Sequence, residues 1–170
     1  SSAFSEDAVS RRIKTLVHRW RSIHHVSTDR AAAAIRADRV DVLIDLAGHT
    51  NGSRLDVLAR KPAPVQMTYM GFPNTTGLKT VDFRVVDSIT DPPGDESLAT
   101  ETLLRLDPCS FSYRPLPDPP PVGPLPCGRD GPITFGAFSA LMKVNGRVVL
   151  LWGGVVEAVL GASRLVEHFS

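Results

Sequence analysis

Val40–Leu46, with the sequence VDVLIDL, is a nearly continuous run of branched apolar residues. Such a run is typical of a strand that is buried on both faces of a parallel sheet. The chain turns directly after it through Ala47–Gly52 and is expected to re-enter a helix at about Ser53. That helix should end before Pro62, because proline disfavours helical geometry in the residue ahead of it. The stretch therefore predicts a strand-loop-helix unit.

The segments on either side extend this pattern. Over Ser5–Trp20 the apolar residues recur at three- and four-residue intervals, behind a serine and two acidic residues that suit a helix N-terminus. A second helix, Arg30–Ala37, is expected behind a capping Asp29. Three further strands are expected over Val65–Tyr69, Val81–Val86 and Thr102–Leu106. Strands that alternate with helices predict an α/β fold with crossover connections.

The last third of the chain reads differently. Pro115–Pro126 holds seven of the 14 prolines, a composition that favours an extended polyproline backbone and predicts a linker. After it, Ile133–Phe138 is typical of the first strand of a new α/β unit and Gly146–Val159 of the helix that follows. We therefore expect a first domain over 1–114, a linker over 115–130 and the start of a second, truncated domain over 131–170. A unit that stops after one strand and one helix should leave an apolar face uncovered.

Composition excludes several classes of function. The 19 basic and 18 acidic side chains leave a net charge of +1, which gives no electrostatic footprint for nucleic acid or an anionic membrane surface. The apolar run Val148–Trp152 is far too short for a bilayer span, and no apolar export signal follows Ser1–Asp7. Cys109 and Cys127 lack metal-ligand spacing, so we expect no metal site and reduced thiols. The expected compartment is the cytoplasm, with the nucleus as an addition in a eukaryotic cell.

Candidate site residues follow from the rule that ligands gather at loops leaving the carboxyl ends of parallel strands. In the first such loop, His49 can exchange a proton near neutral pH, although a structural hydrogen-bonding role is the simpler interpretation. Arg54 can reach a carboxylate, phosphate or peptide carbonyl, or it can be a solvated surface arginine. In the loop Gly71–Gly77 (GFPNTTG), glycines and hydroxyls could bring backbone amides near a sugar, or form an ordinary connection. Lys143 could neutralise a departing diphosphate, or be an exposed lysine at a helix start.

Four linked segments resemble the O-linked N-acetylglucosamine transferase family, including its bacterial and SPINDLY-like members. They are Asp41–Thr50 (DVLIDLAGHT), Arg60–Gln66 (RKPAPVQ), Gly71–Gly77 (GFPNTTG) and Val81–Arg84 (VDFR). The resemblance implies a GT-B architecture of two Rossmann-like domains, usually preceded by tetratricopeptide repeats. It also implies transfer of N-acetylglucosamine from UDP-GlcNAc to serine or threonine hydroxyls of protein acceptors, with inversion and with neither metal nor cofactor. SPINDLY-like members leave protein O-fucosylation from GDP-fucose as an alternative.

The resemblance also assigns roles to individual residues. His49 falls in the motif that lines the active-site cleft, as a catalytic and acceptor-binding candidate, and Arg54 at a position that contacts the acceptor polypeptide. Met70, Gly71 and Pro73 align with the loop near the donor sugar. These roles are expectations that rest on the family pattern and not on the spacing of the residues alone.

A further stretch, Phe135–Lys143, is similar to a segment of that family in which the lysine binds the donor diphosphate. Lys143 is therefore a donor-binding and catalytic candidate that assists departure of the leaving group. Ser139 and Ala140 replace two amides of the family pattern, so hydrogen bonds to the nucleotide should be lost, each worth on the order of 1 kcal/mol if buried partners stay unpaired.

One hypothesis comes from another class of function. The chain begins after the family's N-terminal catalytic histidine motif and ends before its later nucleotide-binding loops. We therefore expect the isolated chain to be inactive, and a non-catalytic remnant or interaction module remains an alternative to an enzyme.

Overall fold

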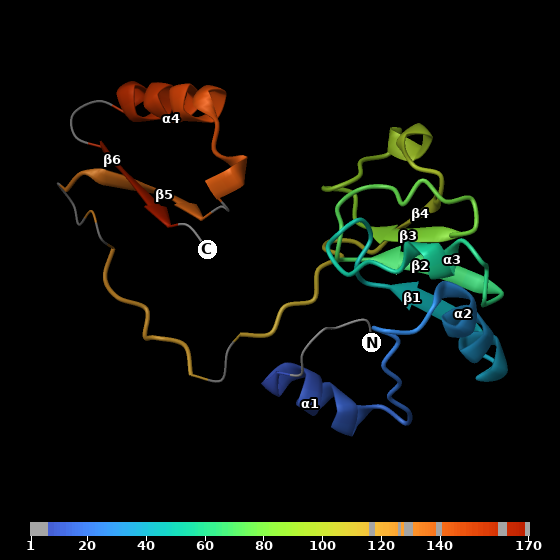
Figure 1. Ribbon diagram of the computed structural model, residues 1–170. Helices are drawn as coiled ribbons and strands as arrows, with labels where there is room; N and C mark the ends of the chain where they lie inside the picture. Colours follow the sequence, from blue (N-terminus) through green and yellow to red (C-terminus); the bar gives the residue numbers. More distant parts are fainter. Residues whose placement is uncertain are drawn as a thin grey trace. The chain divides into compact units, whose positions relative to one another are not determined.

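The computed structural model describes residues 7–115, 118–125, 127, 131–138, 141–159 and 163–168. The chain forms two compact units, Ser1–Tyr113 and Arg114–Ser170 (Figure 1). Each unit contains parallel strands, so the predicted α/β class is confirmed. The assignment of 1–114, 115–130 and 131–170 to two catalytic domains and a linker stays a prediction.

The first unit is built on a four-stranded parallel sheet in the order β1-β2-β3-β4 (Figure 1). Its strands are β1 Val42–Asp45, β2 Val65–Tyr69, β3 Phe83–Val86 and β4 Thr102–Arg105. The predicted bounds of β2 are confirmed, and β1, β3 and β4 are each shorter than expected. Because the strands run parallel, their carboxyl ends meet at one edge of the sheet.

Three helices and a 3-10 turn accompany this sheet. They are α1 Ala8–Leu16, α2 Thr28–Ala37, α3 Leu55–Leu58 and η1 Asp95–Leu98. Helices α2 and α3 pack side by side around Ala31, Ala32 and Val57, all at most 1% exposed. The small alanine side chains allow this close approach, and Ile23 and Val26 pack against the same cluster. One apolar cluster of the unit therefore lies between α2, α3 and the chain that precedes α2, and Val86 and Leu103 are buried on the sheet.

Both N-terminal helices differ from the prediction. Helix α1 covers only part of Ser5–Trp20, and its cap is Asp7, whose carboxylate accepts a hydrogen bond from Ser10 N at 2.7 Å. The predicted Ser5 cap lies outside the described residues. No residue of α1 is buried, so its apolar face is not part of the core. Helix α2 begins at Thr28, and Asp29 lies in its first turn instead of capping it.

The two faces of the sheet differ in chemistry. The buried face carries a polar row that runs through Asp45, Thr68 and Arg84 in register, all at most 9% exposed. On the opposite face, Val42 and Ile44 of β1 are 47% and 49% exposed. The prediction that β1 is buried on both faces is therefore wrong. The reason is that α3 packs over only the other face of β1, while the face with Val42 and Ile44 stays open in the part of the chain that the structure describes.

The second unit is a strand-helix-strand unit. Its elements are β5 Ile133–Phe138, η2 Leu141–Lys143, α4 Gly146–Ala158 and β6 Ser163–His168. Strand β5 has its predicted bounds, and α4 ends one residue earlier than expected. Strand β6 was not expected, and it pairs in parallel with β5 from Ile133 opposite Ser163. Within the described ranges, no helix is both long enough and apolar enough to cross a bilayer.

Candidate functional site

The candidate site is formed by the loops that leave the carboxyl ends of β1, β2 and β3. The first of these loops starts at a buried carboxylate. Asp45, the last residue of β1, accepts a hydrogen bond from Gly48 N at 2.6 Å and lies 3.5 Å from Thr68 Oγ1. The bond turns the backbone sharply after the strand, and Gly48 adopts a φ of 51° at this point. Asp45 thereby shapes the loop that presents His49.

The loops after β1 and β2 are in direct contact, and two glycines make this possible. A Cβ at Gly71 would lie 1.6 Å from the carbonyl oxygen of Leu46, and a Cβ at Gly48 would lie 2.3 Å from Cβ of Phe72. No side chain larger than hydrogen fits at either position without a backbone shift. The resemblance placed Gly71 near the donor sugar, and the structure shows that it also has a packing role.

Met70 is held in a tight turn between β2 and this contact. Gly71 N donates to the carbonyl of Tyr69 at 2.7 Å, and Met70 between them has a φ of +61°. This is a strained backbone conformation for a residue with a side chain, and such strain is concentrated at functional sites. Met70 is 42% exposed, so the turn holds its side chain at the surface of the loop.

His49 lies where the two loops meet. Its Nε2 is 3.0 Å from the carbonyl oxygen of Thr76, and because a carbonyl oxygen only accepts, Nε2 must carry the hydrogen. The ring of Phe72 stands edge-on to the imidazole, with 5.1 Å between the ring centroids. His49 and Thr76 line a shallow hollow of about 470 Å³. The structural hydrogen bond considered for His49 is therefore present, and the ring has a fixed orientation.

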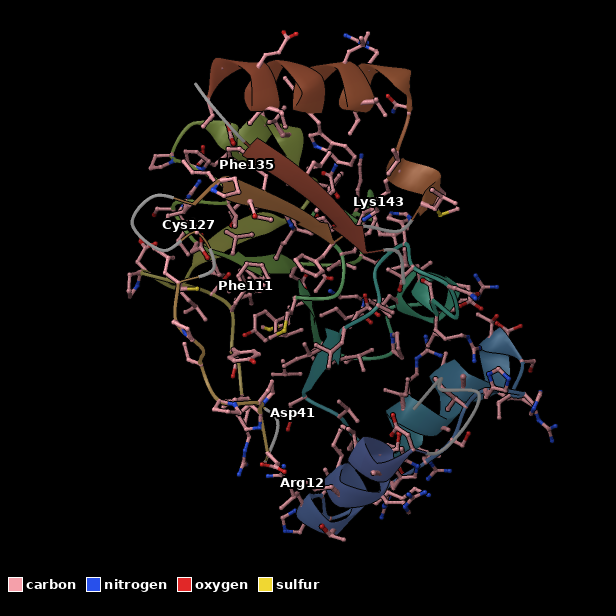
Figure 2. The ribbon with its side chains drawn as sticks, turned by 90° about the vertical axis from the view of Figure 1, so that its left-hand side faces the viewer. Arg12, Asp41, Phe111, Cys127, Phe135 and Lys143 are labelled. Atoms are coloured by element: carbon pink, nitrogen blue, oxygen red, sulfur yellow. The ribbon has the colours of Figure 1, made fainter. Side chains whose placement is uncertain are left out.

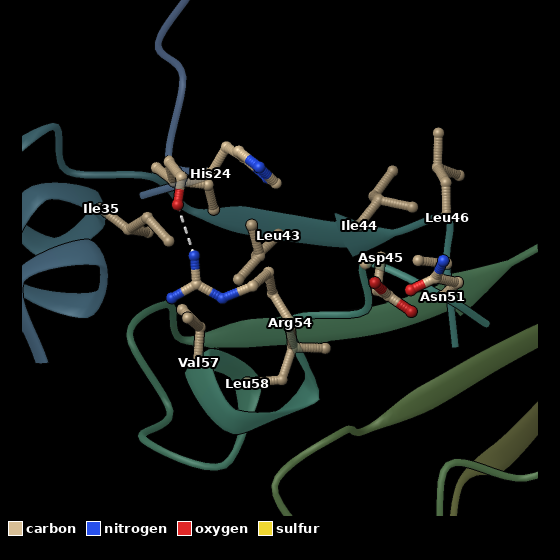
Figure 3. Close-up of a pocket in the computed structure, with 13 residues that line it drawn as sticks. His24, Ile35, Leu43, Ile44, Asp45, Leu46, Asn51, Arg54, Val57 and Leu58 are labelled. Carbon is tan, nitrogen blue, oxygen red and sulfur yellow. Dashed lines mark hydrogen bonds between the residues drawn. The ribbon is translucent and has the colours of Figure 1, made fainter. Parts of the chain in front are cut away.

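Arg54 is not a solvated surface arginine. It stands at the N-cap of α3, its side chain is 17% exposed, and its guanidinium donates to the carbonyls of Ile23 at 2.5 Å and Val26 at 3.1 Å. Figure 3 shows the guanidinium directed away from Asp45 and toward the end of the pocket near Ile35. This pocket, of about 680 Å³, lies beside β1 and does not include His49. Arg54 thus contacts peptide carbonyls, but those of its own chain.

A second pocket, of about 470 Å³, lies at the carboxyl ends of β2 and β3. Met70 and Pro73, the donor-site candidates, both line it, together with Arg84 and Phe111. The Arg84 guanidinium forms a two-point ion pair with Asp91, at 2.7 and 2.9 Å, and also donates to the carbonyl of Pro73 at 3.3 Å. Arg84 therefore fixes the Pro73 loop, a role that its place in the VDFR motif did not indicate.

A second buried carboxylate is that of Asp87, which directly follows β3 and is 2% exposed. Its carboxylate accepts hydrogen bonds from Ser110 N and Ser110 Oγ, both at 2.8 Å, and from the backbone N–H groups of Ile89 and Thr90. The bonds from Ser110, followed by those from Thr90, hold the pKa of Asp87 well below its ordinary value. A carboxylate with this many donors ties the chain after β4 to the end of β3.

Lys143 lies in the second unit, at the end of η2 and two residues before Asn145 (Figure 2). Asn145 caps α4 by accepting hydrogen bonds from Arg147 N at 3.1 Å and Val148 N at 3.2 Å. Lys143 is exposed, which matches the simple interpretation of a lysine at a helix start. The substitutions noted at Ser139 and Ala140 lie outside the described residues.

The predicted site residues are thus distributed unequally. Structure brings His49 and Gly71 together in interlocked loops, while Met70 and Pro73 line the adjoining pocket. Arg54 lines a different pocket, and Lys143 belongs to the other unit. Sequence reasoning missed the carboxylates that shape these loops. In the part of the chain that the structure describes, no three His, Cys, Asp or Glu side chains gather in a way that could hold a metal ion.

Comparisons with known proteins agree on one family. Similarity to glycosyl transferase family 41 covers residues 6–111. The chain is 42% identical over 86% of its length to an Arabidopsis thaliana protein named "Probable UDP-N-acetylglucosamine--peptide N-acetylglucosaminyltransferase SPINDLY", and 40% identical over 98% to the rice protein of that name. Among solved structures, a lysine-to-methionine mutant of O-GlcNAc transferase from Thermobaculum terrenum matches 98% of the chain at 35% identity, with a TM-score of 0.86.

These relatives are much longer than the chain. It spans 16% of the Arabidopsis protein, 18% of the rice protein and 32% of the Thermobaculum chain. The structural match confirms the GT-B type fold class that the family resemblance implied. Because the family similarity extends over more than half of the chain and includes the loops of His49 and Gly71, the chain belongs to glycosyl transferase family 41.

Proposed function

We propose that this chain is part of the catalytic region of a protein O-glycosyltransferase that transfers N-acetylglucosamine from UDP-GlcNAc to serine or threonine hydroxyls of proteins. The observation that carries the proposal is that the family similarity covers the unit in which the loops of His49 and Gly71 interlock. The names of the relatives, which specify a nucleotide-sugar donor and a peptide acceptor, support the same substrates.

The proposed reaction is a single displacement with inversion. The oxygen of the acceptor hydroxyl attacks the anomeric carbon, the bond from that carbon to the diphosphate oxygen breaks, and UDP leaves with the bonding electron pair. The hydroxyl proton passes to a base, and the Nδ1 atom of His49 can accept one because Nε2 carries a hydrogen. We propose no metal or cofactor in this step.

Charge that develops on the leaving diphosphate needs a cation in place of a metal. We assign this role to Lys143, whose exposed ammonium precedes the capped N-terminus of α4. A positive side chain and the positive end of a helix both stabilise an anion, and electrostatic stabilisation of this kind is commonly the largest single contribution to catalysis. Met70, Gly71 and Pro73 would lie beside the donor sugar, with Met70 and Pro73 lining the pocket after β2.

The acceptor role of Arg54 takes a particular form in this proposal. Its guanidinium already binds two backbone carbonyls, of Ile23 and Val26, in a pocket beside β1. An acceptor peptide would offer the same kind of group. We propose that Arg54 holds the acceptor backbone by exchanging one of these internal carbonyls for one of the peptide.

Transfer of fucose from GDP-fucose is the second candidate. It follows from the resemblance to SPINDLY-like members, and identity to the Arabidopsis SPINDLY relative is 42% while identity to the Arabidopsis relative named SEC is 29%. The two reactions share the leaving-group chemistry assigned to Lys143. They differ in the nucleotide base and in the sugar, so donor competition separates them.

The test uses the longest natural protein that contains this chain, with a serine-containing acceptor protein and each labelled donor. We expect sugar transfer from UDP-GlcNAc, a large loss of kcat in Lys143→Ala, and little change in the matched control Arg147→Ala, which replaces an exposed basic residue in the first turn of α4. Transfer from GDP-fucose alone would replace the first candidate by the second.

Calorimetry of the 170-residue chain with UDP addresses the remaining alternative. If the parent transfers neither sugar and the chain gives no binding heat with UDP or GDP, the interpretation as a non-catalytic remnant or interaction module holds instead. We further propose that the protein acts in the cytoplasm and needs no nucleic acid or membrane partner.

A further inference from the structure

Glu101, the residue just before β4, is buried although it is charged. It is 4% exposed, and its carboxylate contacts the loop Gly71–Gly77. Its Oε1 accepts hydrogen bonds from Thr76 N at 2.7 Å and from the Thr76 hydroxyl, and its Oε2 accepts one from Thr75 Oγ1 at 2.7 Å. One carboxylate therefore holds two consecutive residues of the loop by three donors.

The two threonine hydroxyls extend this control into the rest of the turn. Thr75 Oγ1 also accepts hydrogen bonds from Gly77 N at 3.0 Å and Thr100 N at 3.2 Å, and Thr76 Oγ1 accepts one from Leu78 N at 3.2 Å. A hydroxyl has one hydrogen to donate, and in each threonine that hydrogen is directed to Glu101. All three groups that contact the Glu101 carboxylate are donors, and an ionised carboxylate can accept from all of them because it only accepts.

Burial by itself would raise the pKa of Glu101, but the hydrogen bonds from Thr76 and Thr75 outweigh it and hold that pKa below its ordinary value. The carboxyl is thus ionised at neutral pH in the folded chain. A protonated or amide side chain here would present a donor to a hydroxyl that already accepts two hydrogen bonds.

The carbonyl of Thr76 links this carboxylate to the candidate site, because it accepts from His49 Nε2 at 3.0 Å. We propose that Glu101 is a positioning residue for His49. By fixing Thr75 and Thr76, Glu101 holds the Thr76 carbonyl in place. That carbonyl keeps the imidazole hydrogen on Nε2, so Nδ1 carries none. The consequence for catalysis rests on the proposed function, whereas the effect on the His49 ring does not.

Nuclear magnetic resonance of the nitrogen-15-labelled chain tests this positioning without any activity. In the unsubstituted chain we expect a slowly exchanging His49 Nε2 proton and a cross-relaxation signal between the His49 and Phe72 rings. In Glu101→Gln the Nε2 proton should exchange at least about tenfold faster, because the turn opens more often, and the signal to Phe72 should weaken.

The matched control is Glu96→Gln, which removes the same charge from an exposed side chain that pairs with Arg105. It should leave both signals unchanged. If Glu101→Gln fails to fold, Thr75→Val serves for the same measurement, because it removes the donor to Oε2, together with the acceptor for Gly77 N and Thr100 N, and leaves both bonds from Thr76 to Oε1 in place. Unchanged exchange and an unchanged ring contact in a folded Glu101 or Thr75 variant would overturn the proposal.

The activity arm uses the transferase-active parent protein. Glu101→Gln should lower kcat by about tenfold or more, because His49, the group proposed to accept the proton, is no longer held in one orientation. A parent that shows no transfer at all would contradict the proposed function and leave the resonance result to stand alone. A normal kcat in a variant whose His49 ring is mobile would show that the reaction does not need His49 to accept the proton.

Discussion

The first unit and the second unit keep their shapes by different means. In the first, the turns at the carboxyl ends of the strands are held by the buried carboxylates Asp45, Asp87 and Glu101. In the second, no described residue is buried, and a single helix covers two paired strands. The loops of the first unit are held by polar contacts within that unit. The described part of the second unit has no buried residue, and much of its apolar surface is exposed.

The largest effect on the stability of the first unit is expected from Gly71→Ala. The added Cβ would lie 1.6 Å from the Leu46 carbonyl oxygen, so the interlocked loops must separate. We expect a loss of about 3 kcal/mol or more in the free energy of unfolding, measured by urea titration. The control is Gly153→Ala in α4, where nothing lies within 4 Å, and it should raise stability by about 0.5–1 kcal/mol. Two losses of similar size would show that the loop contact is not special.

Asp91→Ala tests whether burial makes the polar contacts strong. The substitution leaves the Arg84 guanidinium, whose side chain is 9% exposed, without its ion partner. An unpaired buried charge should lower the free energy of unfolding by about 3 kcal/mol. In Asp29→Ala the lost partner is Arg60, in a pair of exposed side chains, and the effect should stay below about 0.5 kcal/mol. Equal effects in the two variants would contradict the role of burial.

Acid should weaken the first unit through Asp87. Its pKa in the folded chain lies below the unfolded value of about 3.9, so its contribution to stability is present above that pH and is lost as the pH falls toward the folded pKa. The melting temperature of the unsubstituted chain should therefore exceed that of Asp87→Asn at pH 7. The gap should narrow as the pH falls below about 4. A gap that is constant down to pH 3 would exclude this carboxylate as the cause.

The smallest effect on stability is expected on the outer face of α4. Leu150 and Leu151 are 78% and 67% exposed, so replacing both by glutamate should change the free energy of unfolding by no more than about 1 kcal/mol. Self-association should nevertheless decrease, because contiguous exposed apolar surface promotes it. Sedimentation velocity measures the change, with buried Val57→Glu as the variant that should unfold the first unit. Identical sedimentation with and without the two glutamates would remove α4 as the source of association.

Sequence patterns predicted the elements whose signals are local. Strands β2 and β5 have the expected bounds, because a proline directly precedes each apolar run and marks its start. The burial of β1 on both faces was predicted wrongly, because it depends on whether other elements cover each face, which the run itself does not encode. Strand β6 was missed because Ser163–His168 contains charged residues and becomes a strand by pairing with β5.

The sequence predicted where the candidate site lies, but it did not predict the residues that hold the loops of the site in place. The rule for carboxyl ends of parallel strands indicated the loops of His49 and Gly71, and these loops do meet. The partner that orients His49 is Thr76, 27 residues further along, and Glu101 is a further 25 residues away. No local pattern links positions so far apart, because the parallel crossover connections alone bring them together.

The hydrogen-bonded turn at Thr75 and Thr76 has a consequence for affinity. Its backbone N–H groups and hydroxyls are satisfied by the chain itself in the absence of any ligand. A sugar or peptide that docks there meets a preorganised surface, and the conformational entropy of the turn has already been lost on folding. Ordering of the turn therefore adds no further cost to the other costs of association at this loop.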